Sequence, residues 1–280
     1  MTNDMAATQP TQAAKAEQFL ALHHQDRPLL MPNPWDLGSA RLLASLDFDA
    51  LATTSSGAAA ALGRLDGALT REEAIAHAAT IAGATELPTS ADLQSGFGDE
   101  PPDVAATARL ALAAGLAGFS IEDYSGRDAE PIYGIAIAAE RIAAAAEVAH
   151  GSPVRMVLTA RAENYLHRRP DLEDTIERLR AYETAGADVL YAPGIATEDE
   201  IGALVAALGK PVNVLARPGA PSVSRLAELG VRRVSVGGAF AFAALGTLVE
   251  AARELRDEGT YEFMERAGIG LRAVRQAFAP

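Results

Sequence analysis

The sequence contains no cysteine among its 280 residues, which excludes several kinds of chemistry at once. A chain without cysteine has no disulfide, no thiolate metal ligand and no cysteine nucleophile. Basic residues are also scarce, because 24 Lys and Arg stand against 37 Asp and Glu and give a formal net charge of −13. Such an acidic surplus repels a nucleic-acid backbone, so we expect no nucleic-acid partner. It leaves carboxylates that could bind a divalent cation.

Long hydrophobic runs are absent as well. The most apolar stretches, residues 110–116 and 239–249, are shorter than the roughly 20 residues that a membrane-spanning helix needs. Residues 1–10 have neither the basic region nor the apolar region of a secretory signal, and we expect them to form a loose terminus. These absences favour a cytoplasmic protein with no membrane partner. Because 49% of the residues are hydrophobic and 22% are charged, the chain can bury a core.

Short β-like runs alternate with longer, alanine-rich helical runs along most of the chain. The pattern predicts eight strands, at residues 28–31, 50–53, 87–91, 118–121, 154–159, 188–191, 212–215 and 233–236. It predicts helices between them, at residues 39–46, 71–84, 103–114, 137–150, 172–185, 198–208 and 222–229. Thr70 with Glu73, and Thr197 with Glu200, have the spacing of capping boxes, and Gly186 stands where a helix stops before the next strand.

This alternation is typical of parallel βαβ units, and eight of them in a chain of this length favour a closed (β/α)8 TIM barrel. No G-x-G-x-x-G turn follows a strand, which disfavours an open dinucleotide-binding sheet. No proline- or glycine-rich linker divides the chain, so we expect residues 1–280 to form a single α/β domain.

The sequence after the eighth predicted strand is longer than a barrel requires. Residues 239–258 and 261–278 read as two helical segments split by Gly259, whereas one helix would complete the barrel. The extra segment either caps the barrel or docks on a neighbouring subunit. We favour docking, and therefore expect a homodimer or homotetramer.

Polar and charged side chains gather at the predicted carboxyl ends of the strands, where barrels of this kind carry their active sites. Asp92 follows the third strand, Glu122 and Asp123 end the fourth, and Arg161 ends the fifth. Taken singly, Asp92 could be a turn or capping residue, and Glu122 with Asp123 could form a solvated loop. Together, three converging carboxylates would repel one another unless a cation lies between them. Hard oxygen ligands indicate Mg²⁺ or Mn²⁺.

Two further features of these strand ends suit a carboxylate ligand. Arg161 would face the same cavity, where its planar guanidinium could bind a carboxylate through two hydrogen bonds. Ser56, Gly57 and Ala58 follow the second strand and would present successive backbone N–H groups to an anion. The five histidines lie on predicted helices or beside them, and none is expected to be catalytic.

The motifs at the strand ends carry a family resemblance. In order they read NPWD, TTSSG, SADLQSGFG, SIEDYSG, LTARAEN and PVNVLARPG, and they extend from about residue 29 to residue 242. Together they resemble the isocitrate lyase / phosphoenolpyruvate mutase superfamily. The resemblance implies a Mg²⁺-dependent barrel, assembled as a dimer of dimers in which the helix after strand eight is exchanged between neighbours. It also implies that C–C or P–C bonds are cleaved or formed next to a 2-oxo acid, through a metal-bound enolate.

The resemblance assigns roles to residues that match the family motifs. Ser56, Gly57 and Ala58 would hold the substrate carboxylate, Arg161 would bind the 2-oxo acid, and Asp66 matches the acid after the Ser-Gly turn. Asp92 and Glu122 would bind Mg²⁺, mostly through water. With the neighbouring residues at the strand ends, the candidate site comprises Asp66, Arg161 and Glu163 as catalytic residues, Trp35, Ser56, Gly57, Ala58, Arg161 and Asn213 as substrate-binding residues, and Asp92, Glu122 and Gln94 as metal ligands.

Three departures from the family pattern bear on function. Gln94 replaces the second acid of the motif, so the metal site loses one negative charge. The role of the missing acid could pass to water or to Asp123. The cysteine that isocitrate and methylisocitrate lyases carry in a K-K-C-G-H loop is missing. The loop after Glu122 is short and lacks the gate, containing Lys and Asn, of the phosphonate mutases.

These features favour a Mg²⁺-dependent lyase or decarboxylase that cleaves a C–C bond next to a 2-oxo or 2-hydroxy carboxylate. The substrate would be a small molecule with an oxaloacetate-like or alkylmalate-like skeleton. Two alternatives stay open: a non-catalytic protein that binds a 2-oxo acid such as 2-oxoglutarate, and a phosphonate P–C mutase or hydrolase. The missing acid at Gln94 favours the first of these, and the missing gate disfavours the second.

Overall fold

The computed structural model describes residues 9–279, so most of the expected loose terminus, residues 1–10, lies outside the described residues. Eight parallel strands form one sheet in the order β1-β8-β7-β6-β5-β4-β3-β2. They are β1 (Leu29–Met31), β2 (Leu51–Ala52), β3 (Thr89–Asp92), β4 (Gly118–Glu122), β5 (Val157–Arg161), β6 (Val189–Tyr191), β7 (Val212–Leu215) and β8 (Arg233–Ser235). The Ala52 N–H donates to the Pro32 carbonyl at 3.1 Å and links the two ends of the sheet. The predicted (β/α)8 barrel is thus confirmed.

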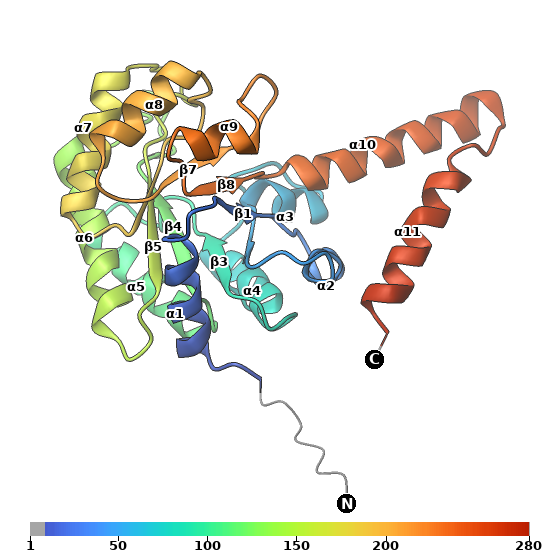
Figure 1. Ribbon diagram of the computed structural model, residues 1–280, viewed down its shortest axis with the longest axis horizontal. Helices are drawn as coiled ribbons and strands as arrows, with labels where there is room; N and C mark the ends of the chain where they lie inside the picture. Colours follow the sequence, from blue (N-terminus) through green and yellow to red (C-terminus); the bar gives the residue numbers. More distant parts are fainter. Residues whose placement is uncertain (1–8, 280) are drawn as a thin grey trace, which may run out of the picture.

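Helices connect the strands and surround the barrel (Figure 1). They are α2 (Leu37–Ala44), α3 (Ser55–Ala61), α4 (Arg71–Ala82), α5 (Pro101–Ala113), α6 (Ile135–Gly151), α7 (Leu172–Thr184), α8 (Glu198–Ala207) and α9 (Val223–Glu228). The capping box predicted at Thr70 forms in both directions: the Glu73 N–H donates to the Thr70 hydroxyl, and the Thr70 N–H donates to the Glu73 carboxylate. All seven predicted helices are present, and only α3 was not anticipated among these eight.

The strands alternate between two kinds of side chain. Apolar residues such as Ile121, Leu158 and Val214 are buried in the main hydrophobic core with residues of the surrounding helices. The residues between them on the strands include Ser120 and Arg161, which line a cavity inside the barrel. Successive residues of a strand point to opposite faces, so this alternation places apolar side chains against the helices and polar ones inside the barrel.

The N-terminal helix α1 (Gln12–Leu22), which was not among the predicted helices, covers one end of the barrel (Figure 1). Its buried Phe19 belongs to an apolar cluster with Leu29, Val157 and Val189, which are the first residues of three strands. Gly118 at the start of β4 has no room for a side chain there, because a Cβ would lie 2.8 Å from the Phe19 ring. The helix therefore closes the end of the barrel opposite to the predicted active site.

The chain after β8 extends away from the barrel as an arm (Figure 1). It consists of α10 (Ala239–Arg253), a π-helical turn η1 (Glu254–Glu258) and α11 (Met264–Ala277). Gly259 separates the two halves in a left-handed conformation with φ 69°, as the predicted break requires. Among the described residues, no helix has both the length and the apolar character of a membrane span.

Candidate active site

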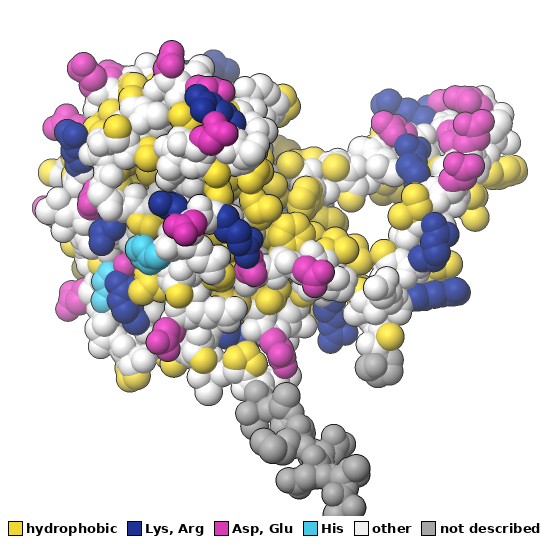
Figure 2. Space-filling model, in the orientation of Figure 1, with side chains coloured by type: hydrophobic (Ala, Val, Ile, Leu, Met, Phe, Trp, Pro, Cys, Tyr) yellow, Lys and Arg dark blue, Asp and Glu magenta, His cyan; other side chains and the backbone are white. Residues whose placement is uncertain are grey.

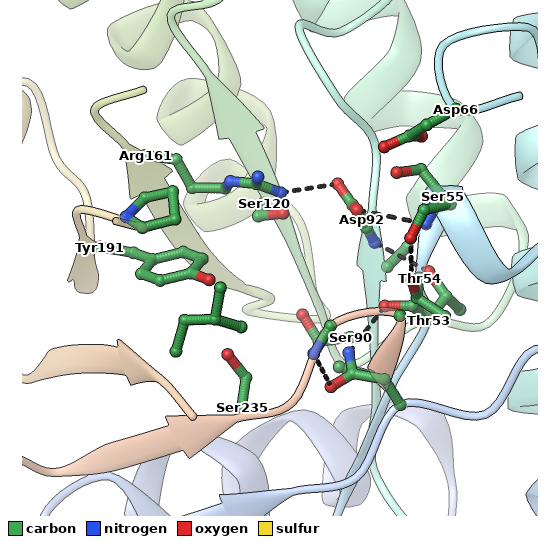
Figure 3. A pocket seen from close by; sticks show the side chains of 18 of the residues that line it. Thr53, Thr54, Ser55, Asp66, Ser90, Asp92, Ser120, Arg161, Tyr191 and Ser235 are labelled. Atoms are coloured by element: carbon green, nitrogen blue, oxygen red, sulfur yellow. Dashed lines mark hydrogen bonds and ion pairs between the residues drawn. The ribbon is translucent and has the colours of Figure 1, made fainter. Parts of the chain in front are cut away.

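A cavity of about 130 Å³ opens at the carboxyl ends of the strands (Figure 3). The loop after β2 forms one wall, and polar side chains from five strands form much of the rest. The strand residues are Ser90 and Asp92 of β3, Ser120 of β4, Arg161 of β5, Tyr191 of β6, and Arg233 and Ser235 of β8. This is the end at which (β/α)8 barrels bind their ligands, so the cavity is the candidate active site.

Arg161 is the central charged residue of this site. Its guanidinium pairs with three carboxylates: Nη1 with Asp92 at 3.0 Å, Nη2 with Glu122 at 3.2 Å, and Nε with Glu163 at 2.8 Å. Glu122 and Arg161 are direct partners in the register of β4 and β5, and Asp92 ends the next strand, β3. The cation that the converging acids were expected to require is therefore partly Arg161 itself. Because each guanidinium nitrogen already faces a carboxylate, Arg161 is not the open carboxylate clamp that was expected.

The cluster contains more carboxyl groups than cations. Three carboxyl groups share one guanidinium, and burial makes their ionised forms costly. Burial raises the pKa of Glu122 well above its ordinary value, against the opposing attraction of Arg161. Burial likewise raises the pKa of Glu163 to about 7. A second cation in this cluster would relieve the repulsion between the acids.

The donor atoms of Asp92 and Glu122 suit a hard divalent cation such as Mg²⁺. Within residues 9–279, however, no three His, Asp or Glu side chains converge so that they could hold a metal ion on their own. A metal ion at Asp92 and Glu122 would have to complete its coordination with water or substrate, which Mg²⁺ commonly does. These two residues therefore fit the expected metal only as a partial ligand set.

Gln94, the third expected metal ligand, does not line the main cavity. Its backbone is in the left-handed region with φ 49°, and its N–H donates to the Asp92 carboxylate at 3.3 Å. Its side chain lines a small cavity behind Asp92 rather than the main cavity. Gln94 thus supports Asp92 through its main chain.

Asp123, to which the role of the missing acid could pass, does not line the main cavity. It is buried, and its carboxylate accepts hydrogen bonds from the Tyr182 hydroxyl at 2.6 Å, the Glu163 N–H at 2.8 Å and Arg178 at 3.3 Å. Asp123 and Tyr182 line a small space beside α6 and α7, and neither of them lines the main cavity. Asp123 instead anchors Glu163 and the start of the loop after β5.

The Ser-Gly segment after β2 forms the first turn of α3 rather than an open anion-binding turn. The Gly57 N–H donates to the Thr54 hydroxyl and the Ala58 N–H to the Thr54 carbonyl, so two of the three expected donors are used inside the helix. A Cβ on Gly57 would lie 2.6 Å from Thr54 and 3.0 Å from Trp35. Position 57 therefore requires a glycine, because its neighbours leave no room for a side chain. Of the three residues, only Ser56 lines the main cavity.

Of the remaining expected residues, one lines the main cavity and three do not. Asp66 lines the cavity from an exposed loop at its mouth (Figure 3). Trp35 does not line it, and its carbonyl contacts His77 Nε2 at 2.9 Å. Asn213 is buried below the cavity, where its amide donates to the Ser235 hydroxyl at 2.9 Å. Glu163 lies behind Arg161 and also does not line the cavity.

Several cavity residues were not singled out from the sequence. Tyr191 and Ser235 lie across the cavity from Asp92 and Ser55 (Figure 3), and burial raises the pKa of the Tyr191 hydroxyl to about 12. Arg233 is a second guanidinium in the cavity wall. The sequence pattern could have predicted these residues. Polar residues at every second position of an otherwise apolar strand, such as Arg233 and Ser235, point into the barrel.

Comparison with known proteins identifies the family. Residues 19–256 match the family model described as phosphoenolpyruvate phosphomutase. An oxaloacetate decarboxylase from Ectopseudomonas mendocina is 32% identical over 85% of this chain and 83% of its own length. The crystal structure of a proposed lyase/mutase from Burkholderia cenocepacia J2315 is 52% identical, covers 96% of this chain and 97% of its own, and has a TM-score of 0.93. The structure of a 2,3-dimethylmalate lyase is 28% identical over 89% of each chain, with a TM-score of 0.79. This chain therefore belongs to the phosphoenolpyruvate phosphomutase family, and so to the lyases and mutases of the isocitrate lyase / phosphoenolpyruvate mutase superfamily.

Proposed function

We propose that this protein is a Mg²⁺-dependent lyase or decarboxylase that cleaves a C–C bond next to a 2-oxo or 2-hydroxy carboxylate. The observation that carries the proposal is the buried cluster of Arg161, Asp92 and Glu122 beside a polar cavity at the carboxyl ends of the strands. Such a cavity can hold a small, highly charged substrate away from bulk water.

Asp92 and Glu122 would hold Mg²⁺ or Mn²⁺ in this enzyme. The bound metal would stabilise the negative charge that develops on the oxygen of the 2-oxo group. Arg161 fixes both carboxylates at distances of 3.0 and 3.2 Å, so that their oxygens are in place before substrate arrives. The hydroxyl groups of Ser56 and Ser120 line the same cavity and can donate hydrogen bonds to a carboxylate.

We assign proton transfer to Asp66, because it lines the mouth of the cavity and can approach a bound ligand. Glu163, the other carboxyl candidate, contacts Arg161 and not the cavity, so we assign it a positioning role. The Asp66→Asn variant should lose turnover and keep ligand binding. A Glu163→Gln variant should weaken both, since it frees one side of the guanidinium.

The relatives narrow the substrate class. The names of two of them point to oxaloacetate and to 2,3-dimethylmalate, both small dicarboxylates, and we propose a substrate of this class here. Purified protein with saturating Mg²⁺ should release a 2-oxo acid from oxaloacetate or from an alkylmalate. An Asp92→Asn variant should release none, while the surface variant Asp49→Asn should match the wild type. No 2-oxo product from oxaloacetate, alkylmalates or methylisocitrate would contradict the proposal.

One observation favours a second candidate function, a protein that binds a 2-oxo acid without converting it. Arg161 is fully engaged by acids, and the described residues offer no complete metal-binding group. Calorimetry with 2-oxoglutarate and oxaloacetate, alongside the turnover assay, separates the two functions. Tight binding without any product would support the second.

We also propose that the arm of α10 and α11 packs on a second copy of this chain. Large apolar side chains are exposed along it, and a gap opens between the arm and the barrel (Figure 2), although the end of α11 contacts α2. They are Phe240, Phe242, Leu245, Leu248, Val249, Leu255, Met264, Ile269, Leu271, Val274 and Phe278. An apolar surface of this extent is typical of an obligate interface, and an equivalent arm could fill the gap in a homodimer or homotetramer.

A further inference from the structure

Arg233 differs from Arg161, the other arginine that lines the main cavity, in what surrounds it. It begins β8, is 4% exposed and lines the main cavity. Its Nη1 donates to the Thr159 hydroxyl at 3.0 Å, and its Nε has no hydrogen-bond partner. Within residues 9–279, no carboxylate lies within ion-pair distance of it, whereas Arg161 in the same cavity pairs with three.

The position of Arg233 follows from the strand. Arg233 and Ser235 are two residues apart on β8 and so point to the same side, into the barrel. Ser235 lies across the cavity from Asp92 (Figure 3). Arg233 therefore sits one layer deeper than Ser235, on the wall opposite to the predicted metal ligands.

A buried cation without an anionic partner is costly, which is why buried charges are normally paired. Burial is the main cause that lowers the pKa of Arg233 to about 10, with the neighbouring charge of Arg161 adding to it. The side chain thus remains a cation at neutral pH. Its surroundings provide neutral polar groups, such as Thr159 and Tyr191, but no compensating negative charge from the protein.

We propose that Arg233 binds the distal carboxylate of a dicarboxylate substrate. A 2-oxo dicarboxylate would place its oxo-acid end at Asp92 and Glu122, and its other carboxylate at Arg233 on the far wall. Arg233 would then be the residue that selects dicarboxylates over monocarboxylates. This inference rests on the proposed function, because it takes the ligand to be a 2-oxo acid bound in the same cavity.

The proposal is tested by comparing the affinities of the protein for two ligands. One is 3,3-difluorooxaloacetate, a 2-oxo dicarboxylate, and the other is pyruvate, which has the same 2-oxo carboxylate without the distal one. Calorimetry in the presence of Mg²⁺ should show that the wild type prefers the dicarboxylate. The Arg233→Met variant should bind the dicarboxylate on the order of 10- to 100-fold more weakly, as expected for a lost charged hydrogen bond, with pyruvate binding nearly unchanged.

Two control variants accompany this test. Arg233→Lys keeps the charge and should retain part of the preference. Arg232→Met removes the neighbouring arginine, whose side chain donates to the Gln25 carbonyl outside the cavity, and should behave as the wild type. If Arg233→Met does not fold, the wild-type preference and the Arg233→Lys variant decide the question.

Three results would overturn the proposal. They are equal affinity of the wild type for both ligands, equal weakening of the binding of both ligands by Arg233→Met, and no effect of that variant on the binding of either. Turnover of oxaloacetate by the wild type is measured separately. If turnover is absent but the dicarboxylate preference depends on Arg233, the proposed lyase activity fails and the inference about Arg233 stands.

Discussion

Two buried arginines in one cavity have opposite surroundings. Arg161 is held by three carboxylates, while Arg233 contacts only neutral groups of the protein. The cavity therefore has an acidic side at Asp92, with Glu122 behind it on Arg161, and a basic side at Arg233. A ligand that satisfies both sides carries a cation at one end and a negative charge at the other, as a metal-bound dicarboxylate does.

Removing Arg161 should destabilise the fold, because it leaves three buried acids facing one another. We expect Arg161→Gln to lower the free energy of unfolding by about 3–5 kcal/mol near pH 8, as measured by urea unfolding. The loss should shrink at pH 5, where protonation of Glu163 and Glu122, whose pKa values are raised by burial, removes part of the repulsion. Arg27→Gln, which breaks the exposed pair with Asp49, should cost less than about 1 kcal/mol. An equal, pH-independent loss in both variants would contradict this account.

Restoring an acid at position 94 should strengthen metal binding. An aspartate tolerates the left-handed backbone of Gln94 and would add a carboxylate beside Asp92. We expect Gln94→Asp to bind Mg²⁺ about tenfold more tightly, measured from the metal dependence of thermal stability or activity. Gln94→Asn, which fits the same backbone without a charge, is the matched control. Unchanged Mg²⁺ affinity in Gln94→Asp would show that this position does not reach the metal.

Among the elements, α1 has the clearest structural role. Its Phe19 closes the barrel end, and its last turn leads into the buried His23, whose Nδ1 contacts the Phe19 carbonyl at 2.7 Å. Burial is the main cause that lowers the pKa of His23 to about 3. This helix thus ties the stability of the barrel to pH.

His23 should make the protein sensitive to acid. The unfolded chain binds a proton at this residue below about pH 6.5, and the folded chain does so only near pH 3. The free energy of unfolding therefore falls as pH drops through this window, by about 1.4 kcal/mol per pH unit and about 2 kcal/mol in total at pH 5. The His23→Gln variant should lack this part of the pH slope in urea unfolding. A slope identical to that of the wild type would refute the assignment.

At the scale of the whole molecule, we propose that the arm mediates association between copies of the chain. Leu248 on α10 is 63% exposed, an unfavourable state for a large apolar side chain unless another chain covers it. We expect the wild type to be a dimer or tetramer in light scattering coupled to size exclusion. Leu248→Glu should weaken association at least about tenfold, because a charge would be buried at the interface. Leu110→Glu, on the outer face of α5, should leave the oligomer intact, and a monomeric wild type would contradict the proposal.

The barrel itself was predictable from the sequence alone. Strand and helix positions follow from apolar periodicity, capping residues such as Thr70 and stop signals such as Gly259, all of which act between neighbours in the chain. The strand-end motifs likewise located Asp92, Glu122 and Arg161 at one end of the barrel. The extra C-terminal helices were recognised in the same way.

Only the tertiary structure decided which of these groups meet. Arg161 and Asp92 are 69 residues apart, and their pairing depends on strand register and barrel curvature, which local sequence does not encode. The same applies to Asp123, which binds Tyr182 and Arg178 outside the cavity, and to Arg233, which points inward without an acidic partner. The sequence alone thus determined the fold and the position of the site. The charges on its two walls emerged only when distant strands came together.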